Sequence, residues 1–216
     1  MSYKLAIFDM DGTILDTLND LTDSVNYALE ASGFPKRTIS EVKSFVGNGI
    51  RKLVERAVPD NIREDEKERV YEQFTKYYKL HCADTTKPYD GILETISTLR
   101  KRGILTAVVS NKADYAVQDL CEKYFKSMFD MAVGAKDGVP KKPFPDAVND
   151  VLRRLRVSAE DAVYIGDSDI DIETALNAKT DSIIVSWGFR EREYLIKKGA
   201  RVLADTPEEL LNLIIS

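Results

Sequence analysis

Short apolar runs alternate along this chain with longer segments whose apolar residues recur every three or four positions. Five runs have the length of a strand and are rich in Val, Ile and aromatic residues: 5–8, 104–109, 131–133, 162–165 and 183–185. Four longer segments have helical spacing: 92–100, 115–125, 144–155 and 170–178. Continuous apolar strands that alternate with helices are typical of a parallel sheet covered on both faces. The pattern therefore predicts an α/β core.

The stretch 17–83 breaks this alternation. A stripe of apolar residues that includes Leu21 and Val25 predicts a helix that ends near Gly33, and the segments 39–46, 50–57 and 64–80 also have helical spacing. On the last of these segments, the spacing places Val70, Phe74 and Tyr77 on one face. The sequence thus predicts a Rossmann-like doubly wound parallel sheet, formed by 1–16 and 84–216, with an inserted α-helical cap domain at 17–83.

Polar side chains follow three of the predicted strands directly. In an open α/β sheet, ligands bind outside the carboxyl ends of the strands, so these side chains are expected to meet at one edge. Carboxylates gathered there need a cation, and a hard divalent ion such as Mg2+ prefers oxygen ligands and shares its shell with phosphate. The residues at the three exits are Asp9 and Asp11, then Ser110, Asn111 and Lys112, and then Asp167, Asp169 and Asp171.

The spacing of Asp9 and Asp11 suggests covalent chemistry. Asp9 at the strand tip is suited to in-line attack on phosphorus, which gives an aspartyl-phosphate. Asp11, one bend later, is placed to protonate the leaving oxygen and then to deprotonate the hydrolytic water. Phosphoryl transfer also needs charge stabilisation, for which Ser110 and Lys142 are the candidates.

Each of these residues also has a plainer interpretation. Asp9 followed by Gly12 is compatible with a strand-to-helix turn, and acids in a first helical turn stabilise a helix, the interpretation we prefer for Asp169. Ser110 is also a candidate N-cap for a helix that begins near residue 113. Of the adjacent lysines 141 and 142, the flanking Pro143 and Pro145 favour Lys142.

Four segments together resemble the motifs of the haloacid dehalogenase superfamily, in order and across almost the whole chain. They are Asp9-Met10-Asp11-Gly12-Thr13, Ser110-Asn111, Lys142-Pro143-Phe144-Pro145 and Gly166-Asp167-Ser168-Asp169-Ile170-Asp171. The resemblance implies that Asp9 is the nucleophile and a metal ligand, and that Asp11 is the acid and base and binds the metal through its carbonyl. It implies phosphate binding by Ser110, with Thr13 and Asn111 beside it, and charge balance by Lys142. Asp167 is then a Mg2+ ligand, and Asp171 binds the ion or orients its waters. An Asp at position 11 favours phosphoryl chemistry over dehalogenation.

A closer resemblance is to the phosphoglycolate phosphatase-like branch, whose helical cap lies between the first and second motifs. It is carried by Val46-Gly47-Asn48-Gly49, Ser186-Trp187-Gly188-Phe189-Arg190 and Asp205-Thr206-Pro207-Glu208-Glu209-Leu210. In the cap, a loop with Gly47, Asn48 and Arg51 is expected either to close over the leaving group or simply to join two helices, with a solvated arginine.

The composition excludes several classes of function. Thirty-one Lys and Arg residues against 36 Asp and Glu residues give a net charge of -5, without the basic excess that nucleic-acid binding needs. With no long apolar stretch and no signal-peptide pattern, a cytoplasmic protein without membrane contact is predicted. The chain has one histidine, His81, and two cysteines that lie far apart in the sequence, Cys82 and Cys121. Zinc sites, disulfides and Ser-His-Asp catalysis therefore have few candidate residues.

The sequence thus predicts a Mg2+-dependent phosphatase that acts on a small phosphorylated metabolite, phosphoglycolate being the best single candidate. A pyrophosphatase or 5'-nucleotidase of the same family is the main alternative. A sugar-phosphate mutase and a non-catalytic phosphate-binding regulator remain as further alternatives. Nothing in the pattern determines the oligomeric state.

Overall fold

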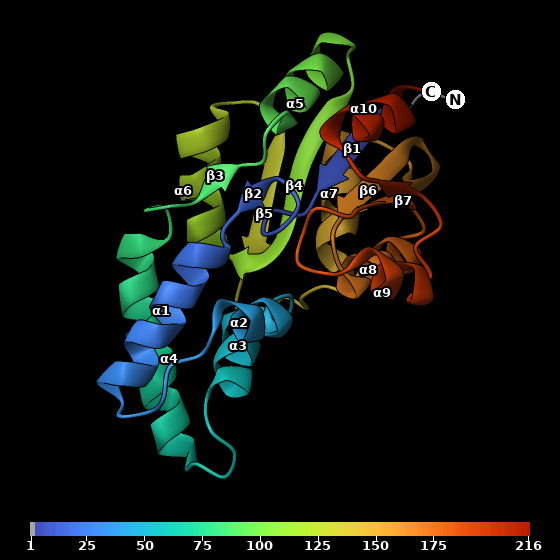
Figure 1. Ribbon diagram of the computed structural model, residues 1–216. Coiled ribbons are helices and arrows are strands. Elements are labelled where there is room, and N and C mark those ends of the chain that lie inside the picture. Colours follow the sequence, from blue (N-terminus) through green and yellow to red (C-terminus); the bar gives the residue numbers. More distant parts are fainter. Residues whose placement is uncertain (1–2) are drawn as a thin grey trace.

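A six-stranded parallel sheet forms the centre of the protein (Figure 1). The computed structural model describes residues 3–216, so residues 1 and 2 of the predicted core segment lie outside it. In the sheet the order is β5-β4-β1-β6-β7-β8, and every neighbouring pair is parallel. The strands are β1 (Leu5–Phe8), β4 (Leu105–Ala113), β5 (Met131–Ala135), β6 (Ala162–Gly166), β7 (Asp181–Val185) and β8 (Leu203–Ala204). β1 therefore lies at the point where the strand order reverses, which is the usual ligand site of such a sheet.

Helices cover both faces of this sheet because its central strands are apolar on both sides. Ala6 and Phe8 face a cluster with α5 (Ile92–Lys101), α6 (Asp114–Phe125) and α10 (Pro207–Ile215). Leu5 and Ile7 point the other way, toward α7 (Asp146–Leu155) and α8 (Asp169–Ala178). The predicted doubly wound parallel sheet is confirmed.

Four helices between β1 and α5 pack around an apolar cluster of their own, and we call them the cap helices. They are α1 (Leu18–Ala31), α2 (Ile39–Phe45), α3 (Ile50–Ala57) and α4 (Glu64–His81). A short antiparallel pair, β2 (Leu15–Asp16) with β3 (Lys87–Pro88), carries the chain out of the core and back. In Figure 1 the cap helices lie below and to the left of the sheet. The exact limits of the cap domain, 17–83, stay a prediction.

The buried face of α4 differs from the prediction by one residue. Val70, Phe74 and Tyr78 are buried, whereas Tyr77 is half-buried and stacks on Tyr27 and His81. Tyrosine occupies both 77 and 78, so spacing alone did not determine which of the two faces the core. Packing against the partner helices determined it. Tyr78, which faces inward, lines a cleft between the cap helices and the core.

The exit of β4 also differs from the prediction. The strand continues to Ala113 and α6 begins at Asp114, so Ser110 lies within the strand and does not cap the helix. The short strand β8 and the helices α9 (Arg192–Lys197) and α10 were not predicted as elements. A strand of two residues carries almost no periodic signal, and it forms here because β7 offers a free edge.

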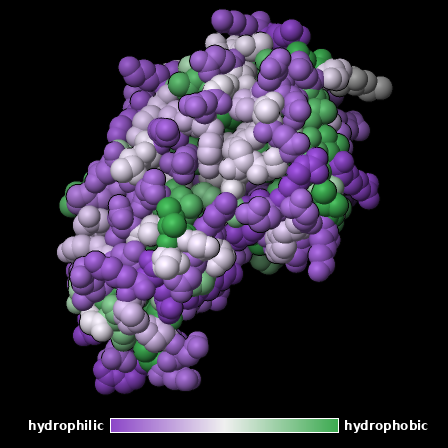
Figure 2. Space-filling model, viewed as in Figure 1, coloured by the Kyte–Doolittle hydropathy of each residue, from purple (hydrophilic) through white to green (hydrophobic). Residues whose placement is uncertain are grey.

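The outer surface fits a largely polar chain. The face in Figure 2 is mainly hydrophilic, with a small hydrophobic area near its centre, where the upper core and the lower helices meet. Within residues 3–216, no helix combines the length and the apolar character that crossing a bilayer requires.

Candidate active site

Three buried carboxylates meet at the carboxyl end of β1 and β6. Asp9 directly follows β1, and its main-chain N–H continues the ladder by donating to the carbonyl of Ile165 at 2.8 Å. Asp167 follows β6, and Asp171 lies in the first turn of α8. One carboxylate oxygen from each of Asp9, Asp167 and Asp171 lies within 4.8 Å of the others. The structure thus brings together the predicted carboxylates from distant parts of the chain.

Lys142 is the buried cation among these carboxylates. Its Nζ lies 2.9 Å from Oδ1 of Asp9 and 2.8 Å from Oδ1 of Asp171, and it donates to the hydroxyl of Tyr164 at 2.9 Å. Burial alone lowers the pKa of Lys142, but Asp171 and Asp9 outweigh it and hold that pKa well above its usual value. The neighbouring Lys141 is exposed, so of the two lysines it is Lys142 that lies among the buried carboxylates.

Two glycines allow the backbone to close tightly around Asp167. A Cβ on Gly12, whose φ is +84°, would lie 2.4 Å from Oδ2 of Asp167, and one on Gly188 would lie 2.3 Å from the same atom. The main-chain N–H of Phe189 donates to that oxygen at 2.6 Å, and the hydroxyl of Thr13 donates to Oδ1 at 3.3 Å. Asp167 is therefore held from both sides.

Negative charge is in excess at this site. Burial, which outweighs the nearby Lys142, raises the pKa of Asp9 to about 6. Burial, with the charges of Asp171 and Asp9, raises the pKa of Asp167 to about 8. Both shifts have the same cause: one lysine does not neutralise three buried carboxylates.

This donor set fits a hard divalent cation. All three side chains offer carboxylate oxygens, the ligands such ions prefer, and the charge they bring exceeds that of Lys142. Oδ1 of Asp9 makes an ion-pair contact with Lys142, but among the described residues it accepts no directed hydrogen bond, which leaves it able to bind a metal. Asp171 already has hydrogen-bond partners within the protein, since its Oδ2 accepts from the N–H and the hydroxyl of Ser168.

Asp11 lies beside this cluster and is held by a lysine that sequence reasoning did not assign. Nζ of Lys112 donates to Oδ1 of Asp11 at 2.8 Å and also donates to the hydroxyl of Tyr78. Burial lowers the pKa of Lys112, but the charges of Asp11 and Tyr78 outweigh it and raise that pKa. The available signal was its position in the sequence, three residues after the strand predicted at 104–109 and directly after Asn111.

The predicted phosphate-binding residues Ser110 and Asn111 also reach the site. Both are buried, and Oγ of Ser110 accepts from the N–H of Lys112 at 3.3 Å. The amide of Asn111 accepts from the N–H of Lys142 at 2.8 Å and donates to the carbonyl of Gly47 at 3.1 Å. Asn111 thus joins the core to the loop between α2 and α3.

Of the predicted cap residues, the structure brings Gly47 into the site but not Asn48 or Arg51. The side-chain oxygen of Asn48 accepts from Arg56 at 2.8 Å. Arg51 is exposed, lies 2.7 Å from Glu68 and stacks on Tyr71 at 4.1 Å. In this arrangement a partner on α4 holds the guanidinium group, and a contact between Arg51 and the substrate stays a prediction.

A cleft of about 580 Å³, including its open mouth, separates the core from the cap helices. Its core side carries the polar groups and its cap side is largely apolar. The core residues are Asp9, Asp11, Ser110, Asn111, Lys112, Asp167, Ser168, Phe189 and Arg190, and the cap residues are Leu21, Val46, Gly47, Gly49, Ile50, Leu53 and Tyr78.

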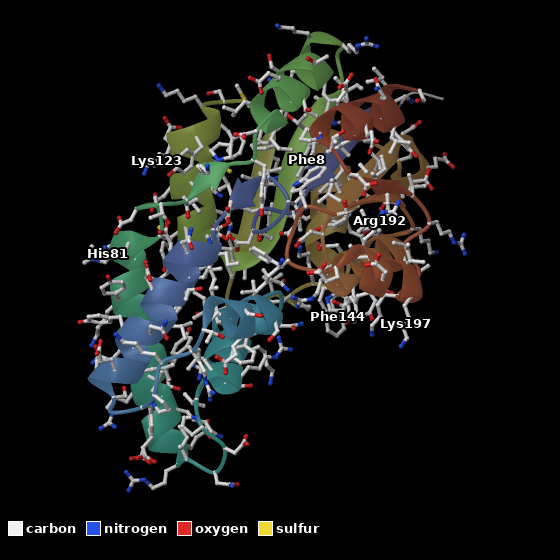
Figure 3. The ribbon with its side chains drawn as sticks, viewed as in Figure 1. Phe8, His81, Lys123, Phe144, Arg192 and Lys197 are labelled. Atoms are coloured by element: carbon white, nitrogen blue, oxygen red, sulfur yellow. The ribbon has the colours of Figure 1, made fainter. Side chains whose placement is uncertain are left out.

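His81 takes no part in this site. It lies at the end of α4, stacks on Tyr77 and is 2.7 Å from Asp84. Figure 3 shows His81 at the outer edge of the molecule, away from Phe8, which directly precedes Asp9.

The family model of the haloacid dehalogenase-like hydrolases matches residues 6–185. The chain belongs to this family. A phosphoglycolate phosphatase of Vibrio parahaemolyticus is 30% identical and covers 98% of this chain and 96% of its own length. An N-acetylmuramic acid 6-phosphate phosphatase of Pseudomonas aeruginosa is 29% identical, and the match covers 99% of this chain and 96% of its own length.

A crystal structure from Lactobacillus delbrueckii subsp. bulgaricus, provisionally named a phosphoglycolate phosphatase, has a TM-score of 0.96 with this chain. It is 42% identical, and the match covers 100% of both chains. The predicted membership of the haloacid dehalogenase-like phosphatases, in the phosphoglycolate phosphatase-like branch, is confirmed by these relatives. The chain is a phosphatase-type enzyme of this family, and its substrate is a phosphorylated small molecule.

Proposed function

We propose that this protein is a Mg2+-dependent phosphomonoester hydrolase that works through an aspartyl-phosphate on Asp9, with phosphoglycolate as its best single substrate. The observation that carries this proposal is the cluster of Asp9, Asp167 and Asp171 around Lys142 at the end of β1. A buried surplus of carboxylate charge, next to a cleft, is the arrangement that a divalent ion and a phosphoryl group would complete.

The reaction has two displacements at phosphorus. A carboxylate oxygen of Asp9 forms a bond to phosphorus while the bond to the leaving oxygen breaks, and the leaving oxygen keeps the electron pair. Asp11 gives that oxygen a proton and later takes one from the water that attacks the aspartyl-phosphate. The second displacement releases inorganic phosphate and restores the Asp9 carboxylate.

The other site residues position the phosphoryl group. The hydroxyl of Ser110 offers a hydrogen-bond donor near the end of β4, and Lys142 balances charge beside Asp9. Thr13 orients Asp167, and the side-chain amide of Asn111 holds the phosphate-binding segment by donating to the carbonyls of Gly47 and Lys142. Asp9, Asp167, Asp171 and the main-chain carbonyl of Asp11 are the groups we assign to Mg2+. The bound ion would neutralise charge on the transferred phosphoryl oxygens.

The substrate proposal rests on the names of the relatives and on the cleft. Phosphoglycolate is named for the Vibrio parahaemolyticus relative, and N-acetylmuramic acid 6-phosphate for the Pseudomonas aeruginosa relative. The cleft lies directly beside the carboxylate cluster, so the leaving group of such a substrate would lie between the core and the cap helices. We place the activity in the cytoplasm, and the segment 17–83 acts as the cap domain that excludes water from the site.

A phosphate-release assay with the full-length protein tests the proposal. The panel contains phosphoglycolate, N-acetylmuramic acid 6-phosphate, pyrophosphate, nucleoside monophosphates and sugar phosphates, each with Mg2+ and with EDTA. We expect the highest kcat/KM with phosphoglycolate and no turnover in EDTA. Asp9→Asn is expected to lower kcat by at least about 10³-fold, because it removes the nucleophile.

Asp23→Asn is the matched control, since Asp23 is an exposed carboxylate on α1, and its activity should equal that of the wild type. Equal inactivity of the wild type and Asp9→Asn across the whole panel contradicts a catalytic role. Conversion of a sugar 1-phosphate into its 6-phosphate without release of phosphate would identify a mutase instead.

A further inference from the structure

Lys112 is a buried lysine that binds one group from the core and one from the cap helices. Its side chain is 2% exposed and that of Asp11 is 15% exposed, and their ion pair is 2.8 Å long. The same Nζ donates to the hydroxyl of Tyr78, a fully buried residue of α4, and lies 4.8 Å from the centre of its ring. A buried ammonium group needs such partners, because burial without them is costly.

Lys112 also contacts a second residue of the site. Its main-chain N–H donates to Oγ of Ser110 at 3.3 Å. One residue at the end of β4 therefore holds both the carboxyl group proposed as acid and base and the hydroxyl proposed to bind phosphate. Since Oδ1 of Asp11 accepts from Lys112, its Oδ2 is left to carry the proton toward the leaving oxygen.

Tyr78 belongs to the apolar cluster of the cap helices, where its ring stacks on Phe74 at 5.2 Å. If the cap helices moved away from the core, the Tyr78 hydroxyl would leave Nζ of Lys112 with a single protein partner, Asp11. The place of Nζ, and with it the direction of the Asp11 carboxyl group, therefore depends on where α4 lies.

We propose that Lys112 is a positioning residue that aims the carboxyl group of Asp11 at the leaving oxygen, and that Tyr78 makes this aim depend on the cap helices covering the core. The inference rests on the proposed hydrolysis. In the step concerned, the bond between phosphorus and the leaving oxygen breaks, the oxygen keeps the electron pair, and the proton passes to it from Asp11.

The dependence of the rate on the leaving group tests this role. An alkyl phosphate needs protonation of its leaving oxygen, whereas a nitrophenyl phosphate, with an acidic leaving group, needs it little. For Lys112→Met we expect kcat/KM to fall about 100-fold with the alkyl phosphate and only about threefold with the nitrophenyl phosphate. For Tyr78→Phe, which keeps the ring, we expect about a tenfold fall with the alkyl phosphate alone.

A double-mutant cycle tests the link between the two residues. In the Lys112→Met background, Tyr78→Phe should have no further effect on the alkyl phosphate, because the hydroxyl acts through Nζ. Tyr77→Phe is the matched control, since Tyr77 directly precedes Tyr78 on α4 and lies outside the cleft. Thermal unfolding of each variant shows whether it is folded, and Tyr78→Phe carries the test if Lys112→Met does not fold.

Equal losses with both substrates overturn the inference, because a general disturbance of the site would affect both alike. Additive effects in the cycle overturn the part assigned to Tyr78. Failure of the wild type to hydrolyse either phosphate is a different result, since it contradicts the proposed function itself.

Discussion

The main-chain N–H of Phe189 donates to Oδ2 of Asp167 at 2.6 Å, while the Phe189 side chain packs in the apolar cluster of the cap helices. The next residue, Arg190, donates to the carbonyls of Lys43 at 3.0 Å and Val46 at 2.6 Å, at the end of α2. Two adjacent residues of the core therefore hold both a carboxylate of the site and the cap helices. The position of the cap and the geometry around Asp167 are physically connected.

Loss of the Arg190 guanidinium group should loosen this connection. For Arg190→Met we expect kcat/KM to fall about tenfold, because hydrogen bonds from a charged group contribute about 1.5–3 kcal/mol and those to α2 would be lost. Steady-state kinetics on the best substrate measure the change. Arg192→Met, which removes an exposed arginine paired with Asp205, is the control and should behave as the wild type. Unchanged kinetics in Arg190→Met would show that these bonds do not hold the cap in its working position.

The two adjacent lysines should respond very differently to the same substitution. Lys142→Met leaves Asp9 and Asp171 without their buried cation, so we expect it to lower the free energy of unfolding by about 3–5 kcal/mol. Lys141→Met removes an exposed side chain and should change that free energy by less than about 0.5 kcal/mol. Urea unfolding, followed by circular dichroism, measures both. Similar values for the two variants would contradict the charge balance assigned to Lys142.

The raised pKa of Asp167 predicts a pH dependence of stability in EDTA. The folded protein keeps this carboxyl group protonated up to about pH 8, whereas the unfolded chain releases the proton near pH 3.9. Between these values the folded state binds more protons, so this group contributes less stability as the pH rises toward 8. As the pH rises toward 8, the free energy of unfolding of the wild type should therefore fall relative to that of Asp167→Asn.

Thermal unfolding of both proteins in EDTA, at pH 5, 6, 7 and 8, measures this difference. Mg2+ in place of EDTA should stabilise the wild type more at pH 8 than at pH 6, because metal and protons compete for the same oxygens. Asp167→Asn should show little response to Mg2+. A difference between the two proteins that does not vary with pH would contradict the shift.

Much of the site followed from local pattern. Asp9 and Asp167 were predicted because each directly follows a buried apolar run, and the carboxyl ends of parallel strands meet at one edge of a sheet. Of the adjacent lysines, the prolines that follow favoured Lys142 over Lys141 as the site residue. These inferences need only the order of elements along the chain.

Three other residues show where local pattern was insufficient. Tyr77 and Tyr78 are chemically alike, and the packing of α1 and α3 against α4 determined that the second faces the cleft. Arg51 has a charge suited to a substrate, but Glu68, 17 residues away, holds it. Lys112 was visible at a strand exit, yet its partners Asp11 and Tyr78 are 101 and 34 residues distant.

The sequence by itself determined the doubly wound sheet, the helical insertion and the carboxylates at the strand ends, because periodicity and strand exits are local properties of a chain. The tertiary structure alone decided how those carboxylates are charged and held. Burial raises the pKa values of Asp9 and Asp167, and Lys112 joins Asp11 to Tyr78, only once distant segments have excluded water between them. Desolvation and long-range ion pairs depend on packing in three dimensions, and no spacing along the chain encodes them directly.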